Sequence, residues 1–235
     1  MIDAHLHLNR LTPADIAQAR EYGVAGFLTA GTCPDDWGKT LALTAPDVKP
    51  FIGTHPWFAD KHDQNLLEKL LLENPAAGAG EIGLDAKAPL EQEAVFAAQF
   101  ALAAELRRPV VVHCVKRFDR LKAFFKQTKL FPPAVLLHGF SGTAQDAAFF
   151  AKYPCFFSFS GRNLKPEVLT AVPADKLTAE TDSPDQRPAD ALCVDAGEER
   201  NVPANLALIL KKIAAITGVD ETQITLNTER FKNAR

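Results

Sequence analysis

Eight short apolar runs alternate with longer amphipathic stretches, and this alternation most restricts the folds open to the chain. The runs, read as strands, span residues 2–8, 24–30, 48–53, 77–82, 109–112, 134–137, 155–159 and 177–179. The helical patterns span residues 13–22, 35–43, 65–73, 90–106, 119–126, 144–152, 165–171, 203–217 and 221–231. Parallel strands need helical crossovers and are near-continuous apolar runs when both faces are covered. Eight such units predict an α/β fold, the TIM (β/α)8 barrel, because open doubly wound sheets more often have about five to seven strands and a glycine-rich phosphate loop.

Length and charge narrow the possibilities further. At 235 residues the chain falls within the roughly 200–250 residues of one α/β barrel, so we expect a single domain over residues 1–235. The net charge of −3, from 26 basic and 29 acidic residues, provides no overall basic field of the kind that dominates non-specific DNA binding. A nucleic-acid substrate would therefore need a metal or a few local basic side chains.

The cysteines and the apolar segments bear on location. Cys33, Cys114, Cys155 and Cys193 lack C-x-x-C spacing, which argues against a zinc ribbon and favours the reduced thiols of a cytosol. No basic stretch precedes an apolar run near residue 1, and no apolar segment approaches about 18 residues. We therefore expect a cytoplasmic protein without a membrane partner, and no obligatory protein partner is evident.

Acidic residues and histidines recur where the predicted strands end. In barrel enzymes the active site gathers at the carboxyl ends of the strands. One such histidine is usually a satisfied polar group, but here six of the eight strands carry one of these residues. Side chains converging there can surround two divalent ions about 3.5–4 Å apart, and mixed histidine and carboxylate ligands suit Zn, Mn, Co or Fe, with Mg possible. The residues concerned are His5, His7, His55, Glu81, His113, His138 and Asp182.

The first run contains Asp3-x-His5-x-His7. Strand alternation places these three side chains on one face, and two imidazoles two positions apart can reach one metal ion. We expect Asp3 not to touch metal but to orient a neighbouring ligand or the strand end.

Motifs in a fixed order give a more specific indication. They are Asp3-x-His5-x-His7, Gly53-x-His55-Pro56, Gly80-Glu-Ile-Gly-Leu-Asp85, His113, His138-Gly-Phe-Ser-Gly142, Glu180-Thr-Asp-Ser-Pro184, Arg200-Asn-x-Pro203 and Asn227 followed by Phe231. This series resembles the TatD family of metal-dependent hydrolases, within the amidohydrolase-like superfamily, and it runs from residue 1 to residue 231.

The resemblance implies a TIM barrel with two divalent metal cations, Mg, Mn or Zn. It places His5, His7 and Asp182 around the first ion, His113 and His138 around the second, and Glu81 between both. It also implies hydrolysis of phosphodiester bonds, chiefly in DNA, by a hydroxide that the two metals activate. The expected catalytic residues are Asp182, which holds the water and accepts its proton, Glu81 and His55.

Substrate contacts follow from the same resemblance. His55 would face the scissile phosphate or the leaving group, while Arg200 and Asn201 would form a substrate-facing loop. Lys116 or Arg117 could also meet the phosphate, so Arg117 joins the predicted substrate-binding residues. The expected substrate is DNA or a small phosphodiester.

Two departures from the family pattern bear on the substrate. Family members often carry an arginine two positions after the strand-five histidine, whereas here the sequence is His113-Cys-Val-Lys-Arg117. The chain is also shorter than typical DNase members. Two alternatives stay open: the same binuclear site hydrolysing an amide, a lactone or a small-molecule phosphoester, and a non-catalytic metal-binding or scaffold barrel.

Overall fold

The computed structural model describes residues 1–89, 91–162 and 164–235, and its strands form one parallel sheet in chain order. Each strand pairs with the next along the chain, from β1 to β8. The strands are β1 Ile2–Leu6, β2 Gly26–Ala30, β3 Val48–Ile52, β4 Gly78–Asp85, β5 Val110–Val115, β6 Val135–Leu137, β7 Cys155–Phe159 and β8 Leu177–Ala179. The predicted TIM barrel is therefore confirmed.

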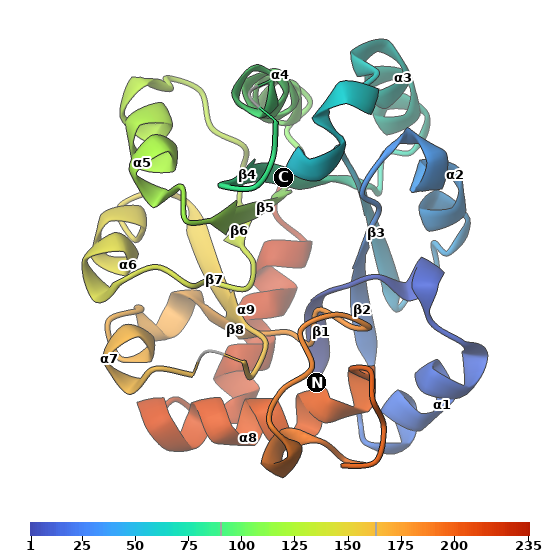
Figure 1. Ribbon diagram of the computed structural model, residues 1–235, viewed down its shortest axis with the longest axis vertical. Coiled ribbons are helices and arrows are strands. Elements are labelled where there is room, and N and C mark those ends of the chain that lie inside the picture. The colour runs from blue at the N-terminus through green and yellow to red at the C-terminus, as the bar shows by residue number, and fades with distance from the viewer. Residues whose placement is uncertain (90, 163) are drawn as a thin grey trace.

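Helices surround the sheet as an outer ring (Figure 1). The helices are α1 Pro13–Glu21, α2 Pro34–Ala42, α3 Gln64–Glu73, α4 Gln92–Glu105, α5 Phe118–Gln127, α6 Ala144–Phe150, α7 Pro166–Leu169, α8 Leu206–Thr217 and α9 Glu221–Lys232. Short 3-10 turns lie at Leu8–Arg10, Pro56–Lys61, Ala174–Lys176, Asp190–Leu192 and Pro203–Asn205. The helix predicted over 203–217 is thus a 3-10 turn followed by α8. Residue 90, the predicted start of another helix, lies outside the described residues.

The barrel closes where the segment after β8 meets β1. The His7 N–H donates to the Ser183 carbonyl at 2.8 Å, and the Asp182 N–H donates to the His5 carbonyl at 2.9 Å. These two bonds bring Asp182 beside His5 of β1 and His7, which directly follows it.

Alternation along the strands divides the apolar residues between two layers. Leu28, Phe51 and Leu136 belong to a cluster inside the barrel, whereas their strand neighbours pack in a second cluster against the helices. Phe231 of α9 joins the inner cluster and stacks on Phe51 with ring centroids 5.7 Å apart. In Figure 1, α9 crosses behind the strands, so it covers the end of the barrel opposite the strand carboxyl ends.

Two strands contain a β-bulge, where one strand has an extra residue relative to the strand it pairs with. Between Asp3 and Leu6, β1 advances three residues while β2 advances two, and β4 does the same against β5 between Ala79 and Ile82. Such bulges re-aim side chains next to active sites. The bulge in β1 breaks the expected alternation, because Ala4 joins the inner cluster while the next residue, His5, faces the barrel mouth.

Among the described residues, no helix combines the length and apolar character needed to cross a membrane.

Candidate metal centre

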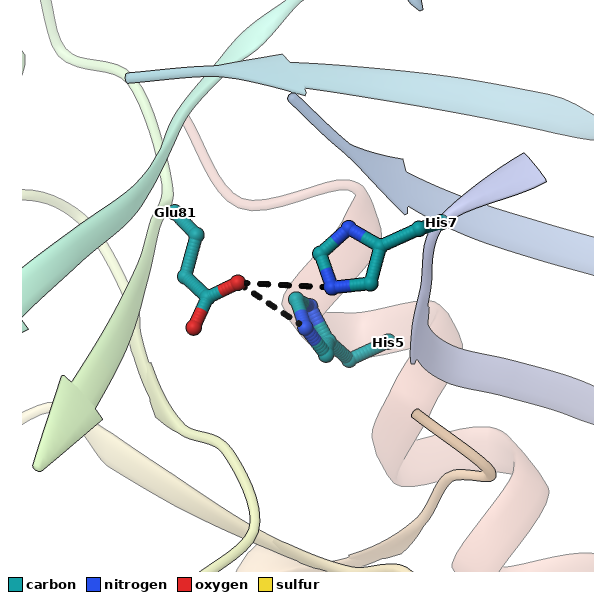
Figure 2. A group of neighbouring side chains, drawn as sticks. All are labelled: His5, His7 and Glu81. Carbon is teal, nitrogen blue, oxygen red and sulfur yellow. Dashed lines mark ion pairs between the residues drawn. The ribbon is translucent and has the colours of Figure 1, made fainter. Parts of the chain in front are cut away.

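Glu81 lies at the centre of the strand carboxyl ends, and its two carboxylate oxygens face different groups. Oε2 lies 3.4 Å from His5 Nε2 and 3.6 Å from His7 Nε2, as Figure 2 shows. Asp182 Oδ1 lies 3.4 Å and 3.5 Å from the same two nitrogens. Four side chains therefore surround one point, which we call the first half-site.

The second half-site lies on the other side of Glu81. Oε1 is 3.0 Å from His113 Nδ1 and 2.7 Å from His138 Nε2. These two nitrogens lie 3.2 Å apart. The structure thus brings together all six residues predicted as metal ligands, with Glu81 shared between the half-sites.

Contacts outside the centre orient the ligand imidazoles. His7 Nδ1 lies 2.9 Å from the Ala30 carbonyl, and His113 Nε2 lies 3.2 Å from Asp85 Oδ2. Carbonyl and carboxylate oxygens only accept hydrogen bonds, so in the neutral ring each of these nitrogens carries the proton. The lone pair of the other nitrogen then points at Glu81, which is the arrangement typical of metal-bound histidine.

Glu180 supports the second half-site in a similar way. Its Oε1 accepts a hydrogen bond from the Gly139 N–H at 2.7 Å and lies 3.6 Å from His138 Nδ1. The Ser158 hydroxyl donates to the other oxygen of Glu180, whose side chain is fully buried. This fixed negative charge favours a proton on His138 Nδ1 and leaves Nε2 free toward Glu81.

His55 has the opposite orientation. Its Nε2 lies 3.5 Å from Glu81 Oε1, but its Nδ1 accepts a hydrogen bond from the Trp57 N–H at 3.2 Å. The neutral ring therefore carries its proton on Nε2, so the nitrogen that faces the site is a hydrogen-bond donor in this state, although His55, Glu81 and His113 also have ligand-type atoms within 4.8 Å of one another. This supports the predicted separation of His55 from the metal ligands.

The donor set suits divalent cations. Three groups of histidine and carboxylate side chains have ligand atoms within 4.8 Å of one another. Both ring nitrogens of His5 are buried and lack hydrogen-bond partners within the described residues. A buried nitrogen is costly without a partner, and a cation between His5, Glu81 and Asp182 would supply one.

The acid–base balance of the centre is consistent with this. Burial disfavours ionised Glu81, but the charge of His138 and a hydrogen bond from His113 hold its pKa well below the ordinary value. Burial and His138 disfavour protonated His5, yet Asp182 and Glu81 raise its pKa to about 9. The pKa values of His113 and His138 are also raised, against the effect of burial, by the carboxylates facing them. Protons thus occupy the ring nitrogens that a metal would take over.

His55 differs in charge as well as in direction. Burial, reinforced by His113 and His138, lowers the pKa of His55 to about 3 although Glu81 opposes the shift. The ring is therefore neutral at neutral pH and presents one N–H to the centre.

The segment after β8 positions Asp182. Its φ of 59° is a left-handed conformation, and the bonds around it hold that turn. Asp3 accepts hydrogen bonds from the Thr181 N–H at 3.0 Å, the Thr181 hydroxyl at 2.6 Å and the His5 N–H at 3.3 Å. Asn201 donates to the Thr181 carbonyl at 2.6 Å. Asp3 therefore ties the strand end to the Asp182 turn, as expected of a residue outside the ligand set.

Two supporting acids were missed as site residues, although both lie in the quoted motifs. Asp85 is the last residue of β4, which extends beyond the predicted 77–82, and it contacts His113. Glu180 directly follows β8. Each follows an apolar run, and that position was the signal that could have identified them.

A cavity of about 690 Å³ opens beside the second half-site. His113, Asp85 and Trp57 line it on one side. Its basic lining residues are Lys87, Lys116 and Arg162, and none of them forms an ion pair within the described parts of the chain. The cavity thus places local positive charge next to the centre.

None of the four predicted substrate-binding residues is in the set that lines this cavity, although His55 lies beside Glu81. Arg117 precedes α5 and lies outside the set that lines the cavity. Arg200 pairs with Asp15 at 2.7 Å and with Glu198 at 3.4 Å. Asn201 is fully buried and donates a hydrogen bond to the Thr181 carbonyl.

Known proteins resemble this chain in sequence and in fold. The 3'-5' ssDNA/RNA exonuclease TatD of Klebsiella pneumoniae (strain 342) is 35% identical over 224 residues, covering 88% of this chain and 84% of that protein. The enzyme of the same name from Escherichia coli (strain K12) is 31% identical, covering 91% and 88%. A solved structure of the TatD homologue YJJV from Escherichia coli K12 superposes with a TM-score of 0.86 at 24% identity, covering 98% and 95%.

The family assignment follows from these matches. The family described as TatD related DNase matches residues 2–233, a range that includes every residue of both half-sites. The chain belongs to the TatD related DNase family.

Proposed function

We propose that this protein is a metal-dependent hydrolase that cleaves phosphodiester bonds in nucleic acid, as the named TatD exonucleases do. The observation that carries the proposal is the position of the Glu81 carboxylate: its two oxygens face two separate sets of histidines. The family membership and the basic cavity beside the centre support nucleic acid as the substrate. We further propose that the protein works in the cytoplasm, which its four free cysteines support.

The residues would divide the work as follows. We propose that His5, His7, Asp182 and Glu81 hold one divalent cation, and that Glu81, His113 and His138 hold a second, with Mg, Mn or Zn as candidates. When bound, such cations polarise a phosphoryl oxygen and lower the pKa of a shared water.

Asp182 and His55 complete the site. Asp182 has a pKa held below its ordinary value by His5 and His7 despite burial, so it is ionised and can accept a hydrogen bond or a proton from a water at the first half-site. His55 presents its Nε2–H beside the second half-site. We propose that His55 binds the substrate phosphate. It would donate a hydrogen bond to a non-bridging or leaving oxygen and so stabilise the negative charge that develops there.

A single substitution tests this function. With Mg or Mn, the purified protein should degrade a single-stranded oligonucleotide and a chromogenic phosphodiester, and chelation should abolish both activities. Glu81→Ala should lose at least about 100-fold in kcat/KM, because it removes a ligand from both half-sites. Glu68→Ala, on the exposed side of α3, is the matched control and should be unchanged.

Two outcomes would contradict the proposal. Turnover by the wild-type protein after exhaustive chelation would exclude the metal mechanism. Hydrolysis of amides or lactones without any phosphodiesterase activity would favour the alternative bond type.

A further inference from the structure

Trp57 is an exposed aromatic side chain beside a buried catalytic centre. It is 55% exposed, whereas the other tryptophan, Trp37, is fully buried. Trp57 follows the His55-Pro56 pair and lines the same cavity as His113. An apolar ring of this size gains free energy when a partner covers it.

The ring of Trp57 is held in place from one side. Its Nε1–H donates to Asp85 Oδ2 at 3.0 Å, and its centroid lies 5.0 Å from that of His55 in an edge-to-face arrangement. Asp85 also contacts His113, so the ring is fixed relative to the second half-site. A preorganised ring loses little conformational freedom when a ligand stacks on it.

Charge around the cavity points to the class of ligand. Lys87, Lys116 and Arg162 line it together with Trp57. Basic side chains that follow a phosphate backbone, combined with aromatic rings on which bases stack, are typical of sites for single-stranded nucleic acid. A base within a duplex is already stacked and paired, and so is not free to cover a protein ring.

We propose that Trp57 is the stacking platform for the nucleobase next to the scissile phosphate, and that it selects single-stranded over duplex nucleic acid. His55 contacts both the indole and the second half-site, with its ring centroid 5.0 Å from that of Trp57 and 4.4 Å from that of His113. The phosphate that His55 contacts and the base on Trp57 would thus belong to neighbouring parts of one nucleotide. This inference rests on the proposed function, since it assumes a nucleic-acid substrate.

The test uses a single-stranded oligonucleotide and a matched strand with a baseless sugar at the nucleotide next to the scissile bond. Trp57→Ala should raise KM or Kd for the normal strand by about fivefold to 150-fold, the loss expected for one base–aromatic stack. It should change binding of the baseless strand by less than about twofold. Trp57→Phe keeps a ring without the Nε1–H and should restore most of the affinity.

Binding is also measured without turnover, in the Glu81→Gln background. The normal strand should quench the fluorescence of Trp57, and this quenching should disappear in Trp57→Phe because Trp37 is buried. Tyr22→Ala is the matched control, an exposed aromatic directly after α1 at the opposite end of the barrel.

Each result separates this inference from the proposed function. If Trp57→Ala lost the same affinity for the normal strand and for the baseless strand, the stacking role would be overturned. That result would indicate that Trp57 acts only through Asp85. Unchanged affinity of Trp57→Ala for the normal strand would also overturn it, as would an equal loss on duplex. No hydrolysis of any strand by the wild-type protein would instead contradict the proposed function.

Discussion

The direction of each imidazole ring decides whether a histidine binds a cation or donates a proton. His7 and His113 use one nitrogen to donate to an oxygen outside the centre, so in the neutral ring the other nitrogen has its lone pair directed into the centre. His55 accepts a backbone N–H instead, and its inner nitrogen carries hydrogen. Three chemically identical side chains therefore have two different roles, set by what lies behind them.

This difference predicts opposite effects of two alanine substitutions. His55→Ala should keep the full metal content but lose about 10²–10³ in kcat, the usual effect of removing one donor to a developing charge. His113→Ala should lose metal, because it removes Nδ1 from the second half-site. Metal per chain after dialysis, measured by elemental analysis, together with kcat checks both. Loss of an ion from His55→Ala would show that His55 is a ligand.

At the scale of the secondary-structure elements, bulges place the ligands. The irregular stretches of β1 and β4 contain His5 and Glu81, and each lets the side chain face the barrel mouth. β4 then continues to Asp85 beside β5, a close approach that Gly83 permits: a Cβ there would lie 2.0 Å from the His113 carbonyl oxygen. Gly83 has φ +156°, which other residues rarely adopt.

Gly83→Ala should therefore push the β5 residue His113 out of position. We expect a loss of about 1–3 kcal/mol in the free energy of unfolding from backbone strain, together with weaker metal binding. Gly38→Ala is the control, because no atom lies within 4 Å of a Cβ there and the site is within α2, where alanine favours the helix. Urea unfolding and metal titration check both. Unchanged metal affinity in Gly83→Ala would contradict the argument.

The order of the strands and helices could be predicted from the sequence, whereas the β-bulges and the long-range side-chain contacts could not. Apolar runs and helical periodicity gave the order of the strands, and the ends of those runs gave the ligands, because both depend on local pattern. The bulge at His5 left no sign in the alternation of Asp3, His5 and His7, since it depends on pairing with β2. One partner of Arg200, Asp15, lies far away along the chain, so that ion pair could not be predicted from the motif around Arg200.

At the scale of the whole molecule, both ends of the described chain meet in the barrel. β1 pairs with β2 and also accepts bonds from the segment after β8, while α9 covers the opposite end through Phe231. We propose that residues 1–235 form one domain, because no part of the barrel is complete without strands from both halves.

The crowded centre also predicts how stability depends on pH. The pKa of His5 is raised from 6.5 to about 9, so the folded state holds a proton that the unfolded chain releases above 6.5. Its contribution to stability is present below pH 6.5 and is lost as the pH rises through 9. His113 and His138 shift in the same direction. The pKa of His55 is lowered from 6.5 to about 3, so this residue changes the pH dependence of stability only below pH 6.5.

The melting temperature of the metal-free protein should therefore fall between pH 6.5 and pH 8; above pH 8 the lowered pKa of Lys49, about 8, adds a contribution of opposite sign. One pKa unit is about 1.4 kcal/mol, which corresponds to roughly 3–6 °C in a chain of this size. Added Mn or Zn should raise the melting temperature more at pH 8 than at pH 6.5, because protons compete with the metal for the same nitrogens. Calorimetry of chelated and metal-loaded samples checks this, and a metal effect that shrinks toward pH 8 would contradict it.

The bond between Asp3 and Thr181 has a consequence for synthesis. The two residues lie 178 positions apart, and the turn that Thr181 begins delivers Asp182 to the histidines of β1. At translation rates of about 5–20 residues per second, roughly 10 to 35 seconds separate their appearance. During that interval the nascent chain carries His5 and His7 without the carboxylate that completes their half-site. The first half-site is therefore complete only after the eighth strand and the turn that follows it have been made.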